Sequence, residues 1–214
     1  MSLTQLGRSV AASGLLFAAA CARGTAAEEQ PSAIAIVDGP VVLHNGLNDV
    51  DLLGDRTPGR VLVTWRGNYN GHGYSVVTFT VRTVSDLGDS GTIWQTIPFF
   101  GGPRDGETGR EIYRTSEGAD CTLGDIRVVR HPGRPVDVII ASRALGASFA
   151  DTASVHFDYY RVARNADAVV GWPPIYLQYV RTVPAHASYC DVNTAFDREL
   201  HLGHDGLGHG EGAR

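Results

Sequence analysis

The 214-residue chain contains no lysine, so all 18 of its basic residues are arginine. Serine β-lactamases and penicillin-binding proteins carry a lysine three residues after the catalytic serine, and a chain without lysine cannot provide it. The sequence also lacks an H-E-x-x-H zinc motif, an H-x-H-x-D cluster and a G-x-S-x-G nucleophile elbow. These absences exclude the common β-lactam, zinc and α/β-hydrolase enzymes, and we expect the protein not to be an enzyme. A Ser/His/Asp set assembled from distant positions stays open, although no spacing favours it.

Basic blocks are also missing. The 23 acidic residues outnumber the arginines and give a formal net charge of −5. Nucleic-acid binding needs a concentrated positive patch, and binding to a membrane surface through a helix needs a basic amphipathic segment. The sequence therefore predicts no nucleic-acid partner.

The N-terminus has the layout of a secretory signal peptide. Arg8 precedes an apolar, alanine-rich segment over residues 10–20, which is too short to span a membrane, and small residues follow it. We expect residues 1–27 to be a signal peptide, residues 28–200 to form one domain, and no transmembrane segment to be present. The expected location is the periplasm. Acylation of Cys21, which would make the protein a lipoprotein, is the alternative.

Two cysteines, Cys121 and Cys190, remain after the leader. An even pair in an oxidising compartment predicts one disulfide. Closing a loop of this length stabilises a fold by about 4 kcal/mol in the chain-entropy treatment. The alternative is two separate thiols.

Short runs rich in β-branched and aromatic residues, each bounded by Gly, Pro, Asp or Asn, dominate the mature chain. This pattern predicts an all-β fold, an antiparallel β-sandwich with one short C-terminal helix. The strand candidates are residues 33–37, 41–44, 60–65, 74–82, 92–97, 126–130, 136–142, 154–162 and 175–183. The expected core residues are Trp65, Phe79, Trp94, Ile139, Phe157 and Tyr176. His156 alternates with core-facing residues, so we expect it on the surface.

The helix follows Cys190. Asp191 is a good N-cap, and Val192, Phe196 and Leu200 fall on one apolar stripe. The glycine- and histidine-rich residues 201–214 are expected to form a flexible tail. Metal binding by its histidines is disfavoured because the surrounding glycines would make a site loose; they are His201, His204 and His209.

An acidic turn at residues 49–59 partly matches a calcium-binding loop. Asp51 and Asp55 stand at its first and fifth positions, but Leu53, Arg56 and Gly59 replace residues that such a loop requires. We predict no metal site and no cofactor, and the sequence leaves open whether this turn binds an ion.

The linker at residues 66–74 carries more hydrogen-bonding groups than a turn needs. It joins two strand candidates, and its polar and glycine residues include Arg66, Asn68, Asn70, His72 and Tyr74. Loops on a rigid β scaffold often carry binding groups, so these five are the candidate ligand-binding residues. The alternative is architectural, with the asparagines in left-handed conformations, the glycines permitting a bulge and His72 satisfying backbone groups.

This loop and its surroundings resemble the CarG-type carbapenem intrinsic resistance proteins, a family of small exported β-sandwich proteins. The likeness lies in residues 49–79, including Asn68, Asn70, Gly71 and His72, and in residues 118–123 and 188–193. The sequence departs from the pattern in the acidic turn, at Leu53, Arg56 and Gly59, which argues against an ion or ligand role there.

The resemblance implies protection against a β-lactam by a non-hydrolytic route, such as binding the drug or a periplasmic protein. In that interpretation His72 and the amides of Asn68 and Asn70 would hydrogen-bond the drug, Arg66 would pair with its carboxylate, and Tyr69 or Tyr74 would cover apolar surface. The alternative function is a cell-envelope interaction or structural module with a protein partner. The sequence also leaves open whether the protein forms a homodimer.

Overall fold

The computed structural model describes residues 39–70, 72–85, 91–106, 108–117, 120–203 and 206–208. The expected signal peptide, Cys21 and the strand candidate at residues 33–37 lie outside these residues. The statements below concern the described part of the chain.

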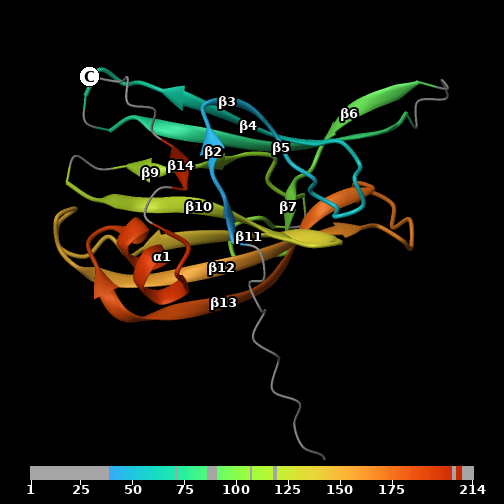
Figure 1. Cartoon of the computed structure of the whole chain (residues 1–214). Coiled ribbons are helices and arrows are strands. Elements are labelled where there is room, and N and C mark those ends of the chain that lie inside the picture. The colour runs from blue at the N-terminus through green and yellow to red at the C-terminus, as the bar shows by residue number, and fades with distance from the viewer. Residues whose placement is uncertain are drawn as a thin grey trace, which may run out of the picture. The chain divides into compact units, whose positions relative to one another are not determined.

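Fourteen strands and one helix make up the regular structure of these residues, which confirms the predicted all-β fold with a short C-terminal helix. Figure 1 shows β3 to β6 gathered in one group of strands and β10 to β13 in another, with α1 against the second group. The strands form three sheets, one of seven, one of five and one of two strands.

The seven-stranded sheet has the order β1, β10, β11, β12, β13, β7, and β9 also pairs with β10. Only the contact of β7 with β13 is parallel; the rest is antiparallel. The strand bounds are β1 Pro40–Val41, β7 Phe99–Phe100, β9 Ser116–Glu117, β10 Thr122–His131, β11 Arg134–Arg143, β12 Ala153–Arg164 and β13 Ile175–Tyr189.

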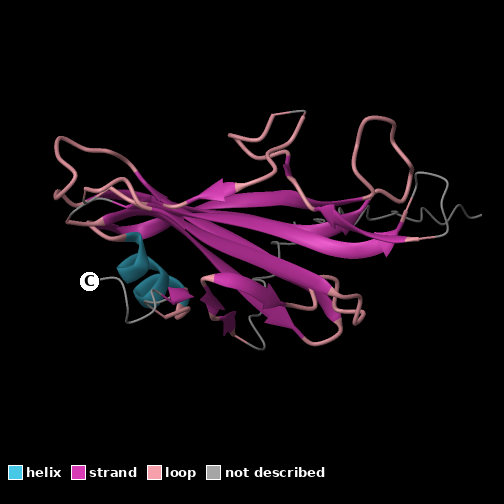
Figure 2. Cartoon of the chain, turned by 90° about the horizontal axis from the view of Figure 1, so that it is seen from above, coloured by secondary structure: helices cyan, strands magenta, loops and turns pink. Residues whose placement is uncertain are grey.

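The five-stranded sheet is antiparallel, with the order β3, β4, β5, β6 and with β8 paired to the start of β5. Its strand bounds are β3 Gly46–Asp49, β4 Gly59–Arg66, β5 Tyr74–Val84, β6 Thr92–Thr96 and β8 Tyr113–Arg114. The small sheet pairs β2 (Leu43–His44) with β14 (Leu207–Gly208) in parallel. Figure 2 shows how strands dominate the structure, with the helix at one end of them.

Alternation along the strands places the core between the two larger sheets. In β5 every second residue from Ser75 to Val81 is buried, while the residues between them are only half-buried. The buried side chains of both sheets belong to one apolar cluster, to which the five-stranded sheet contributes Val61, Val63, Val77, Phe79 and Val81, and the seven-stranded sheet Ile126, Val128, Val136, Val138, Ile140, Tyr160, Val162, Ile175 and Leu177. The molecule is therefore a β-sandwich.

The opposite face of the seven-stranded sheet is covered by α1 (Val192–Leu200) at one end. Phe196 of the helix packs on Phe157 of β12 with ring centroids 5.5 Å apart, and Val192 and Ala195 are fully buried. Asp191 caps the helix by accepting a hydrogen bond from the backbone of Asn193 at 2.7 Å, as the sequence predicts. Among the residues that the structure describes, no helix has the length and apolar content needed to cross a membrane.

Of the six expected core residues, only Phe79 lies in the sandwich core. Phe157 and Ile139 are buried on the helix-covered face, and Tyr176 is half-buried. Trp65 and Trp94 are 46% and 42% exposed. Trp94 lies on the outer face of its sheet, where the guanidinium of Arg60 sits 4.3 Å from its ring. The prediction relied on the apolar character of these residues. The face that each side chain reaches depends instead on its alternating position along the strand and on its distance from the strand end.

Part of the segment expected to be a flexible tail packs on the domain. Leu202 and Leu207 are 2% and 3% exposed, and Leu207 pairs with Leu43 of β2. These two leucines hold residues 202–203 and 206–208 against the sandwich. His204, His209 and the remaining residues up to 214 lie outside the described chain.

Candidate functional site

The loop at residues 66–74 is the tip of the β4–β5 hairpin. Arg66 and Tyr74 are the last residues that pair across the two strands, so the turn itself spans residues 67–73. Gly73 permits the approach of Trp65, since a Cβ at that position would overlap the indole ring. Gly71 lies outside the described residues.

The side chains of Asn68 and Asn70 hydrogen-bond to the loop's own backbone. Asn68 donates from Nδ2 to the carbonyl oxygen of His72 at 2.8 Å, and the backbone amide of His72 donates to Oδ1 of Asn70 at 2.9 Å. These contacts match the architectural interpretation of the asparagines, although the left-handed residue is the one between them. A ligand that bound to the side chains of Asn68 or Asn70 would have to displace these hydrogen bonds to the loop backbone.

Tyr69 is that left-handed residue, with φ of 56° and a fully exposed side chain. A bulky residue at positive φ is strained by roughly 1 kcal/mol or more, and such strain gathers at functional loops. The two asparagine contacts hold the backbone in this conformation. The loop thereby presents an exposed aromatic ring at its tip.

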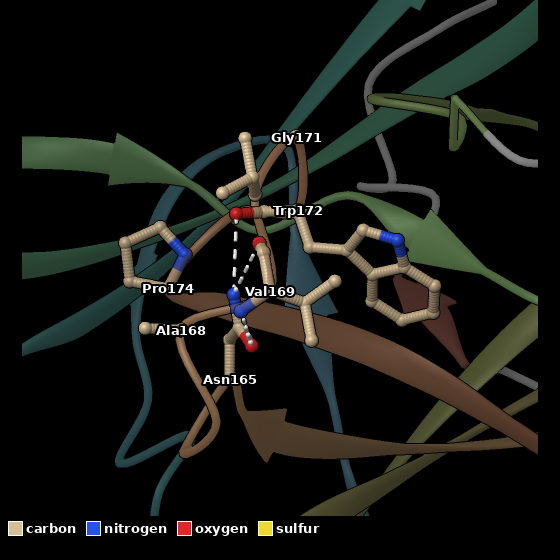
Figure 3. A pocket seen from close by; sticks show the side chains of 7 residues that line it. Asn165, Ala168, Val169, Gly171, Trp172 and Pro174 are labelled. Atoms are coloured by element: carbon tan, nitrogen blue, oxygen red, sulfur yellow. Dashed lines mark hydrogen bonds between the residues drawn. The ribbon is translucent and has the colours of Figure 1, made fainter.

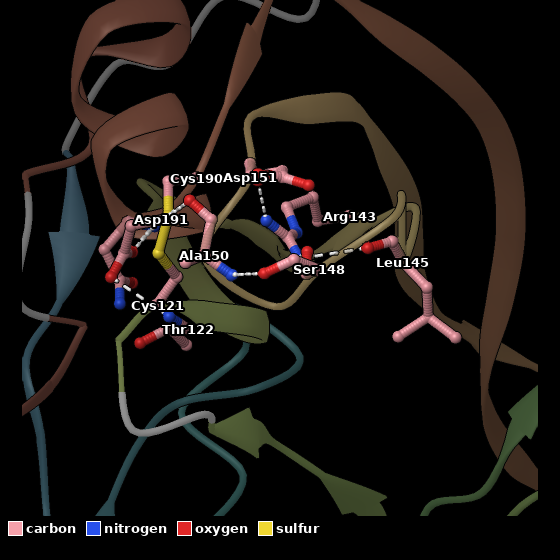
Figure 4. Close-up of a disulfide and its surroundings, with 10 residues drawn as sticks. Cys121, Thr122, Arg143, Leu145, Ser148, Ala150, Asp151, Cys190 and Asp191 are labelled. Carbon is pink, nitrogen blue, oxygen red and sulfur yellow. Dashed lines mark hydrogen bonds between the residues drawn. A yellow bond between two sulfur atoms is a disulfide. The ribbon is translucent and has the colours of Figure 1, made fainter.

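His72 lies beside a second loop. The centroids of the His72 and Phe149 rings are 6.5 Å apart, and Phe149 is 53% exposed. The loop that carries Phe149 is organised by Arg143, whose buried guanidinium donates to the carbonyl oxygens of Asp151, Leu145 and Ser148 (Figure 4). Two loops from different sheets thus meet at the His72 ring.

Arg66 and Tyr74 interact directly, and Arg114 of β8 joins them. Arg66 donates from Nη1 to the phenolic oxygen of Tyr74 at 2.6 Å. The guanidinium carbons of Arg66 and Arg114 lie 5.5 and 5.7 Å from the centre of the Tyr74 ring. Partial desolvation acts to raise the pKa of Tyr74, but hydrogen bonding to Arg114 and Arg66 and their positive charges outweigh it, and the pKa is lowered.

The structure therefore divides the five predicted ligand-binding residues. Arg66 and Tyr74 form one cluster, whereas Asn68, Asn70 and His72 are linked by the hydrogen bonds within the turn. Sequence analysis missed Arg114, because a two-residue strand after a long loop gives no periodic signal that would place it beside the hairpin.

The acidic turn uses its carboxylates to fix its own backbone. Asp51 accepts hydrogen bonds from the amides of Gly54 and Arg56, at 2.8 and 2.9 Å, and Asp55 pairs with Arg164 at 2.8 Å. Hydrogen bonding from Thr57 is the largest influence on Asp55 and lowers its pKa. No group of three or more His, Cys, Asp or Glu side chains is placed to hold a metal ion in the described chain.

The disulfide between Cys121 and Cys190 is present, with the two Cα atoms 5.6 Å apart and a sequence separation of 69. Figure 4 shows it beside Asp191, whose Oδ2 accepts from the amide of Thr122 at 3.1 Å. One carboxylate therefore caps α1 and ties it to the start of β10.

Among the described residues, three histidines contact a carboxylate of the protein itself. His131 Nε2 lies 2.9 Å from Asp137 in the protein interior, where Arg161 also binds Asp137. His186 Nδ1 lies 2.6 Å from Glu199. The third, His156, is half-buried, 3.7 Å from Asp158.

Burial acts to raise the pKa of Glu199, but hydrogen bonds from His186, Tyr189 and the amide of Ala187 outweigh it and lower the pKa to about 2. Glu199 thereby ties α1 to β13. No serine, threonine or cysteine is a hydrogen-bond partner of His131, His156 or His186 among the contacts of the described residues.

A shallow pocket of about 260 Å³ lies in the loop between β12 and β13, far in sequence from the hairpin tip. In Figure 3 the Asn165 side chain points into the loop, where it donates to the carbonyl oxygens of Val169 and Trp172. The lining carries no charged group; it consists of Asn165, Ala168, Val169, Val170, Gly171, Trp172 and Pro174. Sequence analysis did not predict this pocket.

The comparisons with known proteins address the fold. No protein-family model matches the chain, and no curated protein matches it. It is similar to a solved structure titled "Crystal structure of CarG", with a TM-score of 0.60 and 22% sequence identity. The match covers 74% of this chain and 94% of that chain. The protein has a CarG-like fold.

Proposed function

We propose that this protein is an exported, periplasmic relative of CarG that protects its host against a β-lactam by binding and not by hydrolysis. The observation that carries the proposal is the similarity in fold over 94% of the CarG chain. Support also comes from the resemblance of residues 49–79, 118–123 and 188–193 to the carbapenem intrinsic resistance family.

The non-hydrolytic route is supported by the surroundings of the histidines. A serine or cysteine hydrolase needs a histidine within hydrogen-bond reach of its nucleophile and oriented by an acid. His186 has the acid, Glu199, but its hydrogen bonds among the described residues include no hydroxyl or thiol. His131 is buried beside Asp137, away from any substrate.

The hairpin tip is the proposed place of binding. It combines a charged group at Arg66, aromatic surface at Tyr74 and the exposed Tyr69 ring, and the imidazole of His72. Carbapenems carry a carboxylate and carbonyl oxygens, which arginine and imidazole donors recognise. Because Asn68 and Asn70 already bond to the loop backbone, their role is to hold the tip in shape.

The test is growth of a susceptible Gram-negative host that expresses the full chain with its own leader. We expect a higher carbapenem concentration to be needed to stop growth, and the ultraviolet absorbance of the intact β-lactam ring to persist when the drug is incubated with purified protein. His72→Ala should reduce protection, and His44→Ala, another exposed histidine, is the matched control. Loss of the ring absorbance would show an enzyme, and unchanged growth would refute the protective role.

A second candidate, an envelope interaction module, is favoured by the exposed apolar loop between β12 and β13. Val170 and Trp172 there are 97% and 42% exposed, an arrangement more common at protein contacts than on a free surface. Light scattering after size exclusion would detect a homodimer or a complex. A Val170→Asp variant that kept full drug protection and lost the assembly would separate this candidate from the first.

A further inference from the structure

The outer face of the five-stranded sheet, the one turned away from the core, carries the cluster of Arg66, Tyr74 and Arg114. Register places these residues together: Arg66 pairs with Tyr74, and Arg114 pairs with Val76, the next outward residue of β5. Side chains on one face of neighbouring strands lie about 5 Å apart across the strands and about 7 Å apart along them. The cluster is therefore compact and built on strands.

We propose that Arg66, Tyr74 and Arg114 form a binding site for the carboxylate of a small organic acid. The two arginines supply the charge, and both guanidinium carbons lie within 6 Å of the centre of the Tyr74 ring. This inference rests on the proposed function only where the acid is taken to be a β-lactam.

The first argument is that neither arginine is neutralised within the described structure. Five other arginines form ion pairs with an aspartate; they are Arg60, Arg110, Arg127, Arg161 and Arg164. Arg66 and Arg114 form no ion pair with a carboxylate whose side chain the structure describes. The hydrogen-bond acceptor of Arg66 is the phenolic oxygen of Tyr74 and not a carboxylate. An anion between the two guanidinium groups would relieve their mutual repulsion.

The second argument is preorganisation. Arg66 is held by its 2.6 Å hydrogen bond to Tyr74, and both guanidinium groups lie within 6 Å of that ring, in the range of cation–π attraction. Less side-chain entropy is then lost when a ligand binds. The lowered pKa of Tyr74 agrees with a positive potential at the phenolic oxygen.

The third argument is the floor of the cluster. Val76 is half-buried and lies between Thr64 of β4 and Arg114 of β8 on the same face. Val76 and the Tyr74 ring offer apolar contact to the body of an acid, while the hydroxyl of Thr64 offers a polar group. A carboxylate attached to a small apolar ring fits this surface better than a free inorganic anion.

Arg82 is the matched control. It lies on the same outer face of β5, is exposed, and donates to Thr92 at 3.1 Å, but its cross-strand neighbour is Trp94 and not a second arginine. The change of its signal when an anion is added therefore measures the response of a single exposed arginine, with which the responses of Arg66 and Arg114 are compared.

The experiment is a titration of the purified exported protein with benzoate, followed by the side-chain Nε–Hε signals of ¹⁵N-labelled arginines. We expect saturable shifts of Arg66 and Arg114, none with the uncharged analogue benzamide, and none for Arg82. Arg66→Gln or Arg114→Gln should weaken binding about tenfold, the effect of losing one charged hydrogen bond. Arg82→Gln should not change it.

A parallel titration with a carbapenem separates the two proposals. Binding of benzoate without binding of the carbapenem would uphold the carboxylate site and refute drug binding. Carbapenem binding that left Arg66 and Arg114 silent and was unaffected by Arg114→Gln would refute the site and leave the proposed function standing. Equal, unsaturated shifts at all exposed arginines with benzoate would also refute the site.

Discussion

The side chain of Asn68 donates a hydrogen bond to the carbonyl oxygen of His72 at 2.8 Å, across the tip of the β4–β5 hairpin. The backbone amide of His72 in turn donates to Oδ1 of Asn70 at 2.9 Å, so both backbone polar groups of His72 are hydrogen-bonded within the loop. The conformation of the tip therefore depends on two asparagines that act in chemically different ways, one as donor and one as acceptor.

This difference allows a matched pair of variants. Asn70→Asp keeps an oxygen acceptor for the His72 amide, whereas Asn68→Asp removes the amide donor and places a carboxylate against a carbonyl oxygen. We expect Asn68→Asp to lower stability by about 1–2 kcal/mol, which is a fall in Tm of roughly 2–8 °C for a domain of this size, and Asn70→Asp to change it little. Thermal denaturation measures both. Equal losses would contradict the donor and acceptor assignment.

Removal of the disulfide should loosen the attachment of α1. In the chain-entropy treatment a loop of about 70 residues is worth roughly 4 kcal/mol, and we expect Cys121→Ser with Cys190→Ser to lower the free energy of unfolding by about 2–4 kcal/mol. Denaturant titration measures the loss. Ser188→Ala, at an exposed position of β13 near Cys190, is the control and should leave stability unchanged. A double variant as stable as the parent would show that the disulfide does not constrain the unfolded chain.

Glu199 makes stability depend on pH in the acid range. Its pKa is about 2 in the folded protein, below the ordinary value of 4.5, so its contribution is fully present above about pH 4.5 and is lost as the pH falls through 2. We expect Glu199→Gln to be less stable at pH 7 and to lose less stability than the parent between pH 4.5 and 2. Urea titrations across this range test it. Parallel curves for both proteins would contradict the assignment of the pKa.

Arg127 should be costly to replace because its charge is buried. Its guanidinium lies 2.8 Å from Asp125 and 2.7 Å from Asn193, and over the Phe196 ring at 4.3 Å. Loss of one partner of a buried ion pair typically costs about 3–5 kcal/mol, and we expect this for Arg127→Met.

The double variant Asp125→Asn with Arg127→Met provides the control. It should be less damaged than the sum of the two single variants, since it leaves no unpaired buried charge. Denaturant titration of all three gives the coupling energy. Simple additivity would show that the two residues act independently.

Local signals predicted the elements of this fold well. Short runs rich in β-branched and aromatic residues located β4, β5, β6, β10, β11, β12 and β13. Asp191 before an apolar stripe located α1, and both patterns depend on neighbouring residues alone. The short strands β3, β7, β8, β9 and β14 gave no such pattern. Two to four residues cannot establish a period, so their pairing depends on partners far away in sequence.

The burial of core residues and the make-up of the candidate site could not be predicted fully from local sequence patterns. Trp65 and Trp94 read as core residues from their size, yet Trp65 lies at the end of its strand and Trp94 faces outward. The sequence pointed to Arg66 and Tyr74 because they flank an unusual loop. It could not point to Arg114, which reaches them only because β8 pairs with β5, about 40 residues away in the chain.

By itself, the sequence determined the all-β class, the capped helix and the pairing expected of Cys121 and Cys190, since composition, alternation and cysteine count are properties of the chain read in order. Only the tertiary structure decided that the asparagines of the hairpin tip bind their own loop and that a second arginine stands beside Tyr74. The asparagine contacts span only four and two residues, and they depend on the conformation that the hairpin tip takes. The neighbouring charge of Arg114 depends on the register of β8 against β5, which are distant in sequence and are brought together by packing around a common core.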